Sequence, residues 1–119
     1  MEWVIVFTDE FESWWDALNA DEQEDVDALV IVLTEKGPNL RRPYSGIIEA
    51  SKYQNMKELV VQHKGRPYRV LYIFDPRRCA VLLLGGDKTG NDRWYEENVP
   101  KADKIYSNYL EEVTKEGLI

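Results

Sequence analysis

The middle of the sequence carries the side chains that could act on a phosphate. Arg69 stands between Tyr68 and Val70 in an apolar stretch that alternates like a β-strand. Successive strand residues point to opposite faces, so Arg69 should lie on the face away from Tyr68 and Tyr72. A guanidinium held on a rigid strand can bind phosphate oxygens through paired, charge-assisted hydrogen bonds. The sequence also allows a surface ion pair between Arg69 and Glu58 across a hairpin.

A second group of candidates follows a strongly apolar run. Lys88 lies in the glycine-rich segment 85–90, where the backbone could approach a phosphate closely. The segment lacks the spacing of a Walker loop, which argues against a nucleoside triphosphatase. Trp94 and Tyr95 come next, and their rings could stack on a base or anchor a helix on the sheet.

Histidine and cysteine each occur once, as His63 and Cys79. A single residue of each type excludes the usual Cys/His zinc clusters and an internal disulfide framework, so no cofactor or metal is expected. His63 could assist proton transfer near neutral pH or be a hydrogen-bonded bystander. Cys79 begins an apolar run and fits a small core residue.

Charge is distributed unevenly along the chain. The net charge is -7 and the isoelectric point about 4.7, yet residues 1–35 hold eleven acids and no base, whereas residues 36–93 hold twelve bases and five acids. Local potential steers a polyanion, so the middle of the chain could form a basic surface on an acidic body. Alternatively, helices carry the acids and strands the bases. The candidate basic surface includes Lys57, Lys64, Arg66, Arg69, Arg77, Arg78, Lys88 and Arg93.

Hydrophobic periodicity predicts one α+β domain over residues 1–119. The expected order is β-α-α-β-β-β-α, a helix hairpin packed on a mainly antiparallel sheet with a C-terminal helix. We expect strands at 3–7, 58–63, 68–74 and 80–84, helices at 9–18, 21–36 and 92–114, and a loop at 37–54. The uninterrupted apolar run 80–84 predicts a central strand buried on both faces.

Acidic residues at the helix starts suggest how the first two helices begin. Asp9 with Glu12, and Asp21 with Glu24, fit capping boxes. Their carboxylates favour the helix dipole, so no catalytic carboxylate pair is needed to explain them. The chain has no apolar stretch of membrane-spanning length and no signal-peptide pattern at its start, so a cytoplasmic protein without membrane contact is expected.

Several motifs together resemble the RelE/ParE toxin superfamily, in its phage-derived HigB-like branch. They span nearly the whole chain, and any one of them alone would be weak. The motifs are Gly37-Pro38-x-Leu40-x-Arg42-Pro43-Tyr44, Met56-Lys57-Glu58-Leu59-Val60-Val61, Arg66-Pro67-Tyr68-Arg69-Val70-Leu71-Tyr72, Leu83-Leu84-Gly85-Gly86-Asp87-Lys88 and Asn91-Asp92-Arg93-Trp94-Tyr95.

The resemblance implies a toxin of a type II toxin–antitoxin pair. Many relatives cleave messenger RNA in the ribosomal decoding site without a metal, by activating a ribose 2'-hydroxyl against the adjacent phosphate. A helix-turn-helix antitoxin of the HigA kind usually neutralises such a toxin, and an oligomer with the antitoxin is expected.

The resemblance also implies roles for single residues. Arg69 matches the arginine that stabilises the phosphorane-like charge, and Lys57 lies where relatives place a base for the 2'-hydroxyl. Lys88 matches the position that protonates the leaving 5'-oxygen, and Tyr95 the aromatic that orients the nucleotide. Expected RNA contacts are Lys64, Arg66, Arg77, Arg78, Arg93, Trp94 and His63, with His63 and Arg66 also second-choice participants in the chemistry.

Two further functions remain compatible with the sequence. The chain also resembles the gyrase-poisoning members of the superfamily, which share the fold without needing the RNA-cleaving residues. A non-catalytic, partner-binding or degenerate toxin module is the other alternative. The overall acidity departs from the strongly basic composition of ribosome-acting relatives.

Overall fold

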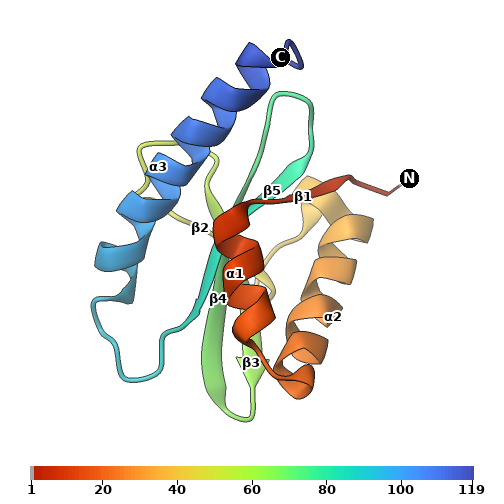
Figure 1. Cartoon of the computed structure of the whole chain (residues 1–119). Helices are drawn as coiled ribbons and strands as arrows, with labels where there is room; N and C mark the ends of the chain where they lie inside the picture. Colours follow the sequence, from red (N-terminus) through yellow and green to blue (C-terminus); the bar gives the residue numbers. More distant parts are fainter. Residues whose placement is uncertain (1) are drawn as a thin grey trace.

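A computed structural model describes residues 2–119 and shows the α+β class that the sequence predicts (Figure 1). Three helices and five strands follow one another in an order close to the expected one. They are β1 (Ile5–Phe7), α1 (Asp9–Ala17), α2 (Ala20–Lys36), a 3-10 turn η1 (Gly37–Asn39), β2 (Ser45–Ile47), β3 (Lys57–His63), β4 (Arg66–Phe74), β5 (Ala80–Asp87) and α3 (Trp94–Lys115).

The strands form a single sheet in the order β1-β5-β4-β3-β2. Only the β1–β5 pair is parallel; the other pairs are antiparallel. As its apolar run predicts, β5 lies inside the sheet between β1 and β4, and Ala80–Leu84 are all buried. The short strands β1 and β2 form the two edges.

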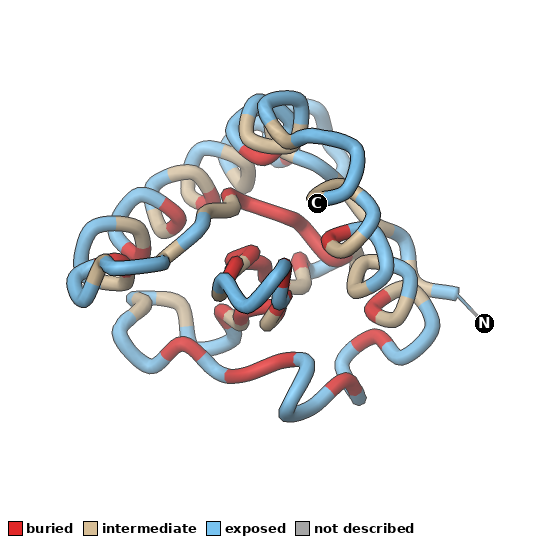
Figure 2. Tube along the Cα trace, turned by 90° about the horizontal axis from the view of Figure 1, so that it is seen from below, coloured by how far each residue is buried: buried red, intermediate tan, exposed pale blue. Residues whose placement is uncertain are grey.

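Helices cover both faces of the sheet, with α1 and α2 on one side and α3 on the other (Figure 1). Figure 2 shows buried segments toward the middle of the molecule and exposed segments on the outer turns. The core under α1 and α2 contains Phe11, Val26, Leu33, Leu59, Tyr68, Val70 and Tyr72. The core under α3 contains Leu71, Ile73, Leu83, Trp94, Val99, Ala102 and Tyr106. Strand alternation therefore sends neighbouring residues of β4 into different cores.

The helix starts differ in detail from those predicted. Thr8 caps α1, because its Oγ1 accepts a hydrogen bond from the backbone N–H of Phe11 at 3.1 Å. Asn19 caps α2 and forms a capping box with Glu22. Each cap thus lies one or two residues before the acid chosen from the sequence, where acidic first turns offered several candidates with similar spacing.

The stretch predicted as a loop, residues 37–54, contains η1 and the edge strand β2. Gly46 of β2 lies opposite Glu58 of β3, and Ile47 lies opposite Lys57. This strand matters for the candidate site, because it borders Lys57 and Glu58 of β3. No helix within residues 2–119 has the length and apolarity needed to cross a membrane.

Candidate active site

Arg69 and Glu58 meet on the sheet face that α3 covers. Arg69 lies opposite Val60, and Glu58 lies two residues before Val60 on β3, so the two side chains share a face. Arg69 Nε lies 3.1 Å from Glu58 Oε1, and their side chains are only 13% and 10% exposed. The ion pair that the sequence allowed is therefore present, in a largely buried setting where charges are screened less than at an open surface.

Tyr95, in the first turn of α3, completes this contact. Its hydroxyl donates to Glu58 Oε1 at 2.6 Å and accepts from Arg69 Nε at 3.2 Å. Burial, reinforced by the hydrogen bond to Glu58, raises the pKa of Tyr95. The phenol therefore stays neutral at physiological pH and acts as a donor rather than as a base.

The guanidinium of Arg69 is fixed from a second side by the backbone. Its Nη1 donates to the carbonyl of Tyr68 at 2.9 Å. Among residues 2–119, Nη2 has no hydrogen-bond partner. Arg69 is thus held in orientation by Nε and Nη1 while N–H groups of Nη2 remain available to an anion.

Lys88 lies at the rim of this group. Its Nζ is 5.6 Å from the centre of the Tyr95 ring, and its backbone N–H donates to the carbonyl of Pro67 at 2.9 Å. This backbone hydrogen bond connects the loop after β5 to the start of β4. We call Arg69, Glu58, Tyr95 and Lys88 the Arg69 cluster; it contains three of the four predicted catalytic residues.

Lys57, the fourth predicted catalytic residue, is not brought to the Arg69 cluster. It precedes Glu58 on β3, so its side chain lies on the opposite face, with Nζ 6.0 Å from the centre of the Phe74 ring and 3.5 Å from the carbonyl of Pro38. Burial lowers the pKa of Lys57, and the nearby positive charge of Arg41 lowers it further. In this arrangement Lys57 cannot serve the same phosphate as Arg69.

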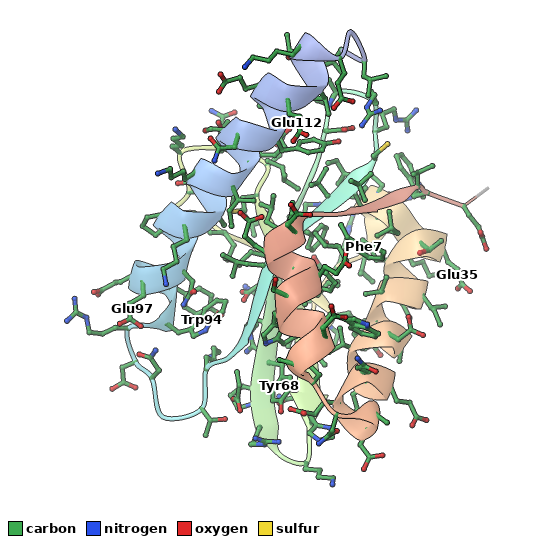
Figure 3. The ribbon with its side chains drawn as sticks, viewed as in Figure 1. Phe7, Glu35, Tyr68, Trp94, Glu97 and Glu112 are labelled. Carbon is green, nitrogen blue, oxygen red and sulfur yellow. The ribbon has the colours of Figure 1, made fainter. Side chains whose placement is uncertain are left out.

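Two predicted RNA contacts are buried. His63 is 2% exposed, and its Nδ1 lies 2.6 Å from Asp25 Oδ2 of α2. Trp94 is 4% exposed and packs over Gly86 on the inner side of α3 (Figure 3). Neither ring can contact RNA in this conformation, which corrects the expectation for both. His63 is instead a hydrogen-bonded histidine, and Trp94 anchors α3 on the sheet; the sequence allowed both of these alternatives.

The other predicted RNA contacts are divided between the two ends of the sheet. Lys64, Arg66 and Arg93 lie at the same end as the Arg69 cluster, and each is engaged by a carboxylate, of Asp21, Asp87 and Glu96 respectively. Arg77 and Arg78 lie in the β4–β5 turn at the other end, where Arg77 contacts Asp75 and Tyr109 and Arg78 lies over Trp3. The predicted basic surface is therefore not one continuous patch.

Sequence reasoning missed Glu58 and Arg42 as members of the site. Glu58 entered only as a partner for Arg69, although strand alternation puts it, and not Lys57, on the Arg69 face. Arg42 lies beside Glu58 across Gly46: a Cβ on Gly46 would be 3.2 Å from Arg42 Nη2 and 3.4 Å from Glu58 Oε2. No local pattern indicates this approach, since it depends on the pairing of β2 with β3.

An open groove of about 450 Å³ adjoins the Arg69 cluster. Its lining includes Arg42, Ile47, Glu58, Tyr95 and Val99. A ligand in this groove would reach Glu58 and Tyr95 directly. Within residues 2–119, no group of three or more His, Cys, Asp or Glu side chains is arranged to hold a metal ion.

Residues 13–107 match the family described as phage-derived protein Gp49-like (DUF891). The chain belongs to this family. Two relatives of this Gp49-like chain are candidate toxins of Mycobacterium tuberculosis. HigB3 is 42% identical over 107 residues, which cover 89% of this chain and 92% of HigB3. HigB2 is 37% identical over 100 residues, covering 82% of this chain and 50% of HigB2.

A solved structure supports the same conclusion for the fold. A variant of the Escherichia coli toxin RelE in the free state matches with a TM-score of 0.55, covering 85% of this chain and 98% of that one. At 17% sequence identity, this match concerns the fold alone. Together the findings confirm the sequence resemblance: this Gp49-like protein is a HigB-like toxin with a RelE-type fold.

Proposed function

We propose that this HigB-like toxin cleaves messenger RNA on the ribosome and that the Arg69 cluster is its active site. The observation that carries the proposal is the fixed position of Arg69 against the carboxylate of Glu58 and the hydroxyl of Tyr95, two groups that line an open groove. Preorganised donors aimed at developing charge supply much of the rate enhancement in enzymes.

The geometry suggests one role for each side chain in the reaction. The ribose 2'-oxygen attacks the adjacent phosphorus while its proton passes to the carboxylate of Glu58. Arg69 stabilises the added negative charge on the phosphoryl oxygens through Nη2. The bond from phosphorus to the 5'-oxygen breaks, and the ammonium of Lys88 donates a proton to that oxygen. The products are a 2',3'-cyclic phosphate and a 5'-hydroxyl.

Glu58 takes the role of base that the resemblance assigned to Lys57. Its Oε1 already accepts a hydrogen bond from Tyr95 and forms an ion pair with Arg69, and both contacts keep the carboxylate oriented. Tyr95 holds Glu58 in place as a neutral donor. Lys57 has no part in these steps, because its ammonium group lies on the other side of the sheet.

A toxin of this kind implies an antitoxin, and we expect a helix-turn-helix protein of the HigA type to be the partner, in a complex of several chains. Ribosomes and messenger RNA are the expected targets, so the toxin would act in the cytoplasm. A small helix-turn-helix reading frame beside this gene would support the pairing.

Induction in bacterial cells, followed by mapping of messenger-RNA 5' ends, tests the proposal. We expect new 5' ends inside translated codons and growth arrest, both lost with Arg69→Ala. Arg78→Ala is the matched control: contrary to the expectation that Arg78 contacts RNA, its side chain lies over Trp3 at the other end of the sheet, so its removal should leave cleavage intact. Growth arrest without new 5' ends would contradict cleavage and favour gyrase as the target. No arrest would favour a degenerate toxin or a binding module.

A further inference from the structure

Three cations gather at the edge of the sheet formed by β2. They are Arg41, Arg42 and Lys57, which line a groove of about 390 Å³. Among residues 2–119, no carboxylate lies within 4.0 Å of any of their charged groups, whereas Arg66 and Arg69 each pair with a carboxylate. A concentration of like charge without a partner is unfavourable in the free protein and favours binding of an anion.

The two arginines lie on opposite sides of this edge. Arg42 approaches Gly46 on the Glu58 side, with Nη2 3.2 Å from the position that a Cβ would occupy. Arg41 is close enough to Lys57, on the other face, for its charge to lower the pKa of the ammonium group. The consecutive arginines therefore connect the Arg69 side of the sheet with the Lys57 side.

Two grooves join at the same place. The groove beside the Arg69 cluster and the groove at Lys57 share Arg42, Ile47 and Glu49 as lining residues. Tyr44 and Ile47 are 51% and 64% exposed along this edge and offer apolar surface to a base. A path thus leads from Glu58 and Tyr95 around β2 to Lys57. Glu49 is the one acidic residue that lines both grooves.

We propose that the single-stranded RNA bound at the Arg69 cluster continues around the β2 edge, where its phosphates bind Arg42, Arg41 and Lys57. This inference rests on the proposed function and extends it with a second contact region. It gives Lys57 a role in binding rather than in proton transfer. Continuity with the Arg69 cluster favours a flanking part of the same RNA over an acidic peptide, which would have no reason to follow that path.

Binding of a short, fluorescein-labelled, fully 2'-O-methylated single-stranded RNA tests the inference, because this probe cannot be cleaved. Fluorescence anisotropy gives the dissociation constant at several salt concentrations. The double variant Arg41→Gln/Lys57→Met keeps both side-chain stems and removes both charges. We expect weaker binding and a salt slope of log K smaller by about 1.4, since each phosphate contact with a single strand contributes about 0.7.

The control variant Lys104→Gln/Lys115→Gln also removes two charges, but on α3, and should leave the slope unchanged. Arg41→Gln alone should lower the slope by about half as much. Because Arg41 is exposed, this single variant should fold even if the double variant does not. An unchanged slope in both Arg41 variants would overturn the inference, as would failure of the parent protein to bind the probe. Messenger-RNA 5' ends in cells decide the proposed function separately.

If the Arg41 and Lys57 charges prove necessary for binding the antitoxin and not for binding RNA, the edge is a protein-docking surface. That result would also overturn the inference. Co-purification of the antitoxin with each variant, measured beside the RNA titration, distinguishes the two outcomes.

Discussion

At the scale of single residues, the site depends on which of two neighbours on β3 faces Arg69. Lys57 and Glu58 are adjacent in sequence and therefore point to opposite faces. The register with β4 brings Glu58 to Arg69 and turns Lys57 toward Phe74. Side-chain alternation along a strand predicted the face of Arg69. The same rule places Lys57 on the other face, but only once it is known that Val60 pairs with Arg69.

Glu58→Gln tests whether the carboxylate accepts the proton. The amide keeps an oxygen that can accept from Tyr95 but cannot take up a proton, so we expect cleavage to fall by about 10²- to 10⁴-fold while ribosome binding is retained. Single-turnover cleavage of messenger RNA on purified ribosomes gives the rate. Lys57→Met is the comparison, because it changes the adjacent residue on the other face and should retain the rate at saturating substrate.

If the cleavage rate of Glu58→Gln is within a few fold of the parent's, Glu58 positions Arg69 but does not accept the proton. Thermal unfolding of both variants should accompany the kinetics, since the substitution also weakens an ion pair of low exposure.

At the scale of elements, two glycines of β5 determine how helices pack on the sheet. A Cβ on Gly85 would come within 2.3 Å of the Trp14 ring of α1, and a Cβ on Gly86 within 2.7 Å of Trp94 Nε1 of α3. The sequence suggested that this glycine-rich segment admits a phosphate. In the fold, Gly85 and Gly86 instead admit two indole rings, one on each face of the sheet.

Gly86→Ala should therefore disturb the start of α3. The added methyl group forces Trp94 away from β5, which we expect to cost about 1–3 kcal/mol in the free energy of unfolding. Tyr95 follows Trp94, so its contacts with Glu58 and Arg69 should loosen and cleavage should fall as well. Denaturant unfolding and cleavage assays measure the two effects.

Gly90→Asn is the control for this substitution. Gly90 has a positive φ of 68° with nothing within 4 Å of its Cβ position, and asparagine tolerates that conformation better than other residues. Gly90→Asn adds backbone strain but no clash, so it should cost less stability than Gly86→Ala. A loss for Gly86→Ala no larger than that for Gly90→Asn would contradict the clash with Trp94, because Gly86 does not have a positive φ.

The elements themselves were largely predictable because their patterns are local. Apolar spacing located the three helices and four of the strands, and the apolar run identified β5 as an interior strand. The strand β2 was missed because its three residues, Ser45–Ile47, include a glycine and become a strand only by pairing with β3. A loop and a short edge strand look alike when the pairing partner is unknown.

Burial explains why the structure brings some of the predicted site residues together at an accessible place and not others. Arg69, Lys88 and Tyr95 come together as the resemblance implied, although their chemical roles stay predictions. His63 and Trp94 have the chemistry of RNA contacts but lie in the two cores. From the sequence alone, a ring that packs in the core cannot be distinguished from a ring that contacts RNA. The positions of α2 over His63 and of α3 over the sheet decide between the two roles.

At the scale of the whole molecule, most acids of the N-terminal part of the sequence lie across the sheet from the Arg69 cluster. The acids of residues 1–35 lie mainly on α1 and α2, which cover one face of the sheet. The Arg69 cluster lies on the face that α3 covers. This separation means that a net charge of -7 need not repel RNA from the site.

The dependence of RNA association on ionic strength should show whether the acids on α1 and α2 repel RNA from the Arg69 cluster. The exposed acids Glu10, Asp16 and Asp27 lie on the outer side of α1 and α2. A helix with its side chains is about 10 Å across, so this layer separates the acids from the sheet. This thickness exceeds the Debye length of about 8 Å at physiological salt but not the roughly 30 Å at 0.01 M. The variant Glu10→Gln/Asp16→Asn/Asp27→Asn should therefore associate with single-stranded RNA faster than the parent at low salt and equally fast at physiological salt, which stopped-flow anisotropy can measure. A faster association at both salt concentrations would mean that RNA passes close to α1 and α2, so the path to the Arg69 cluster would have to cross the acidic side.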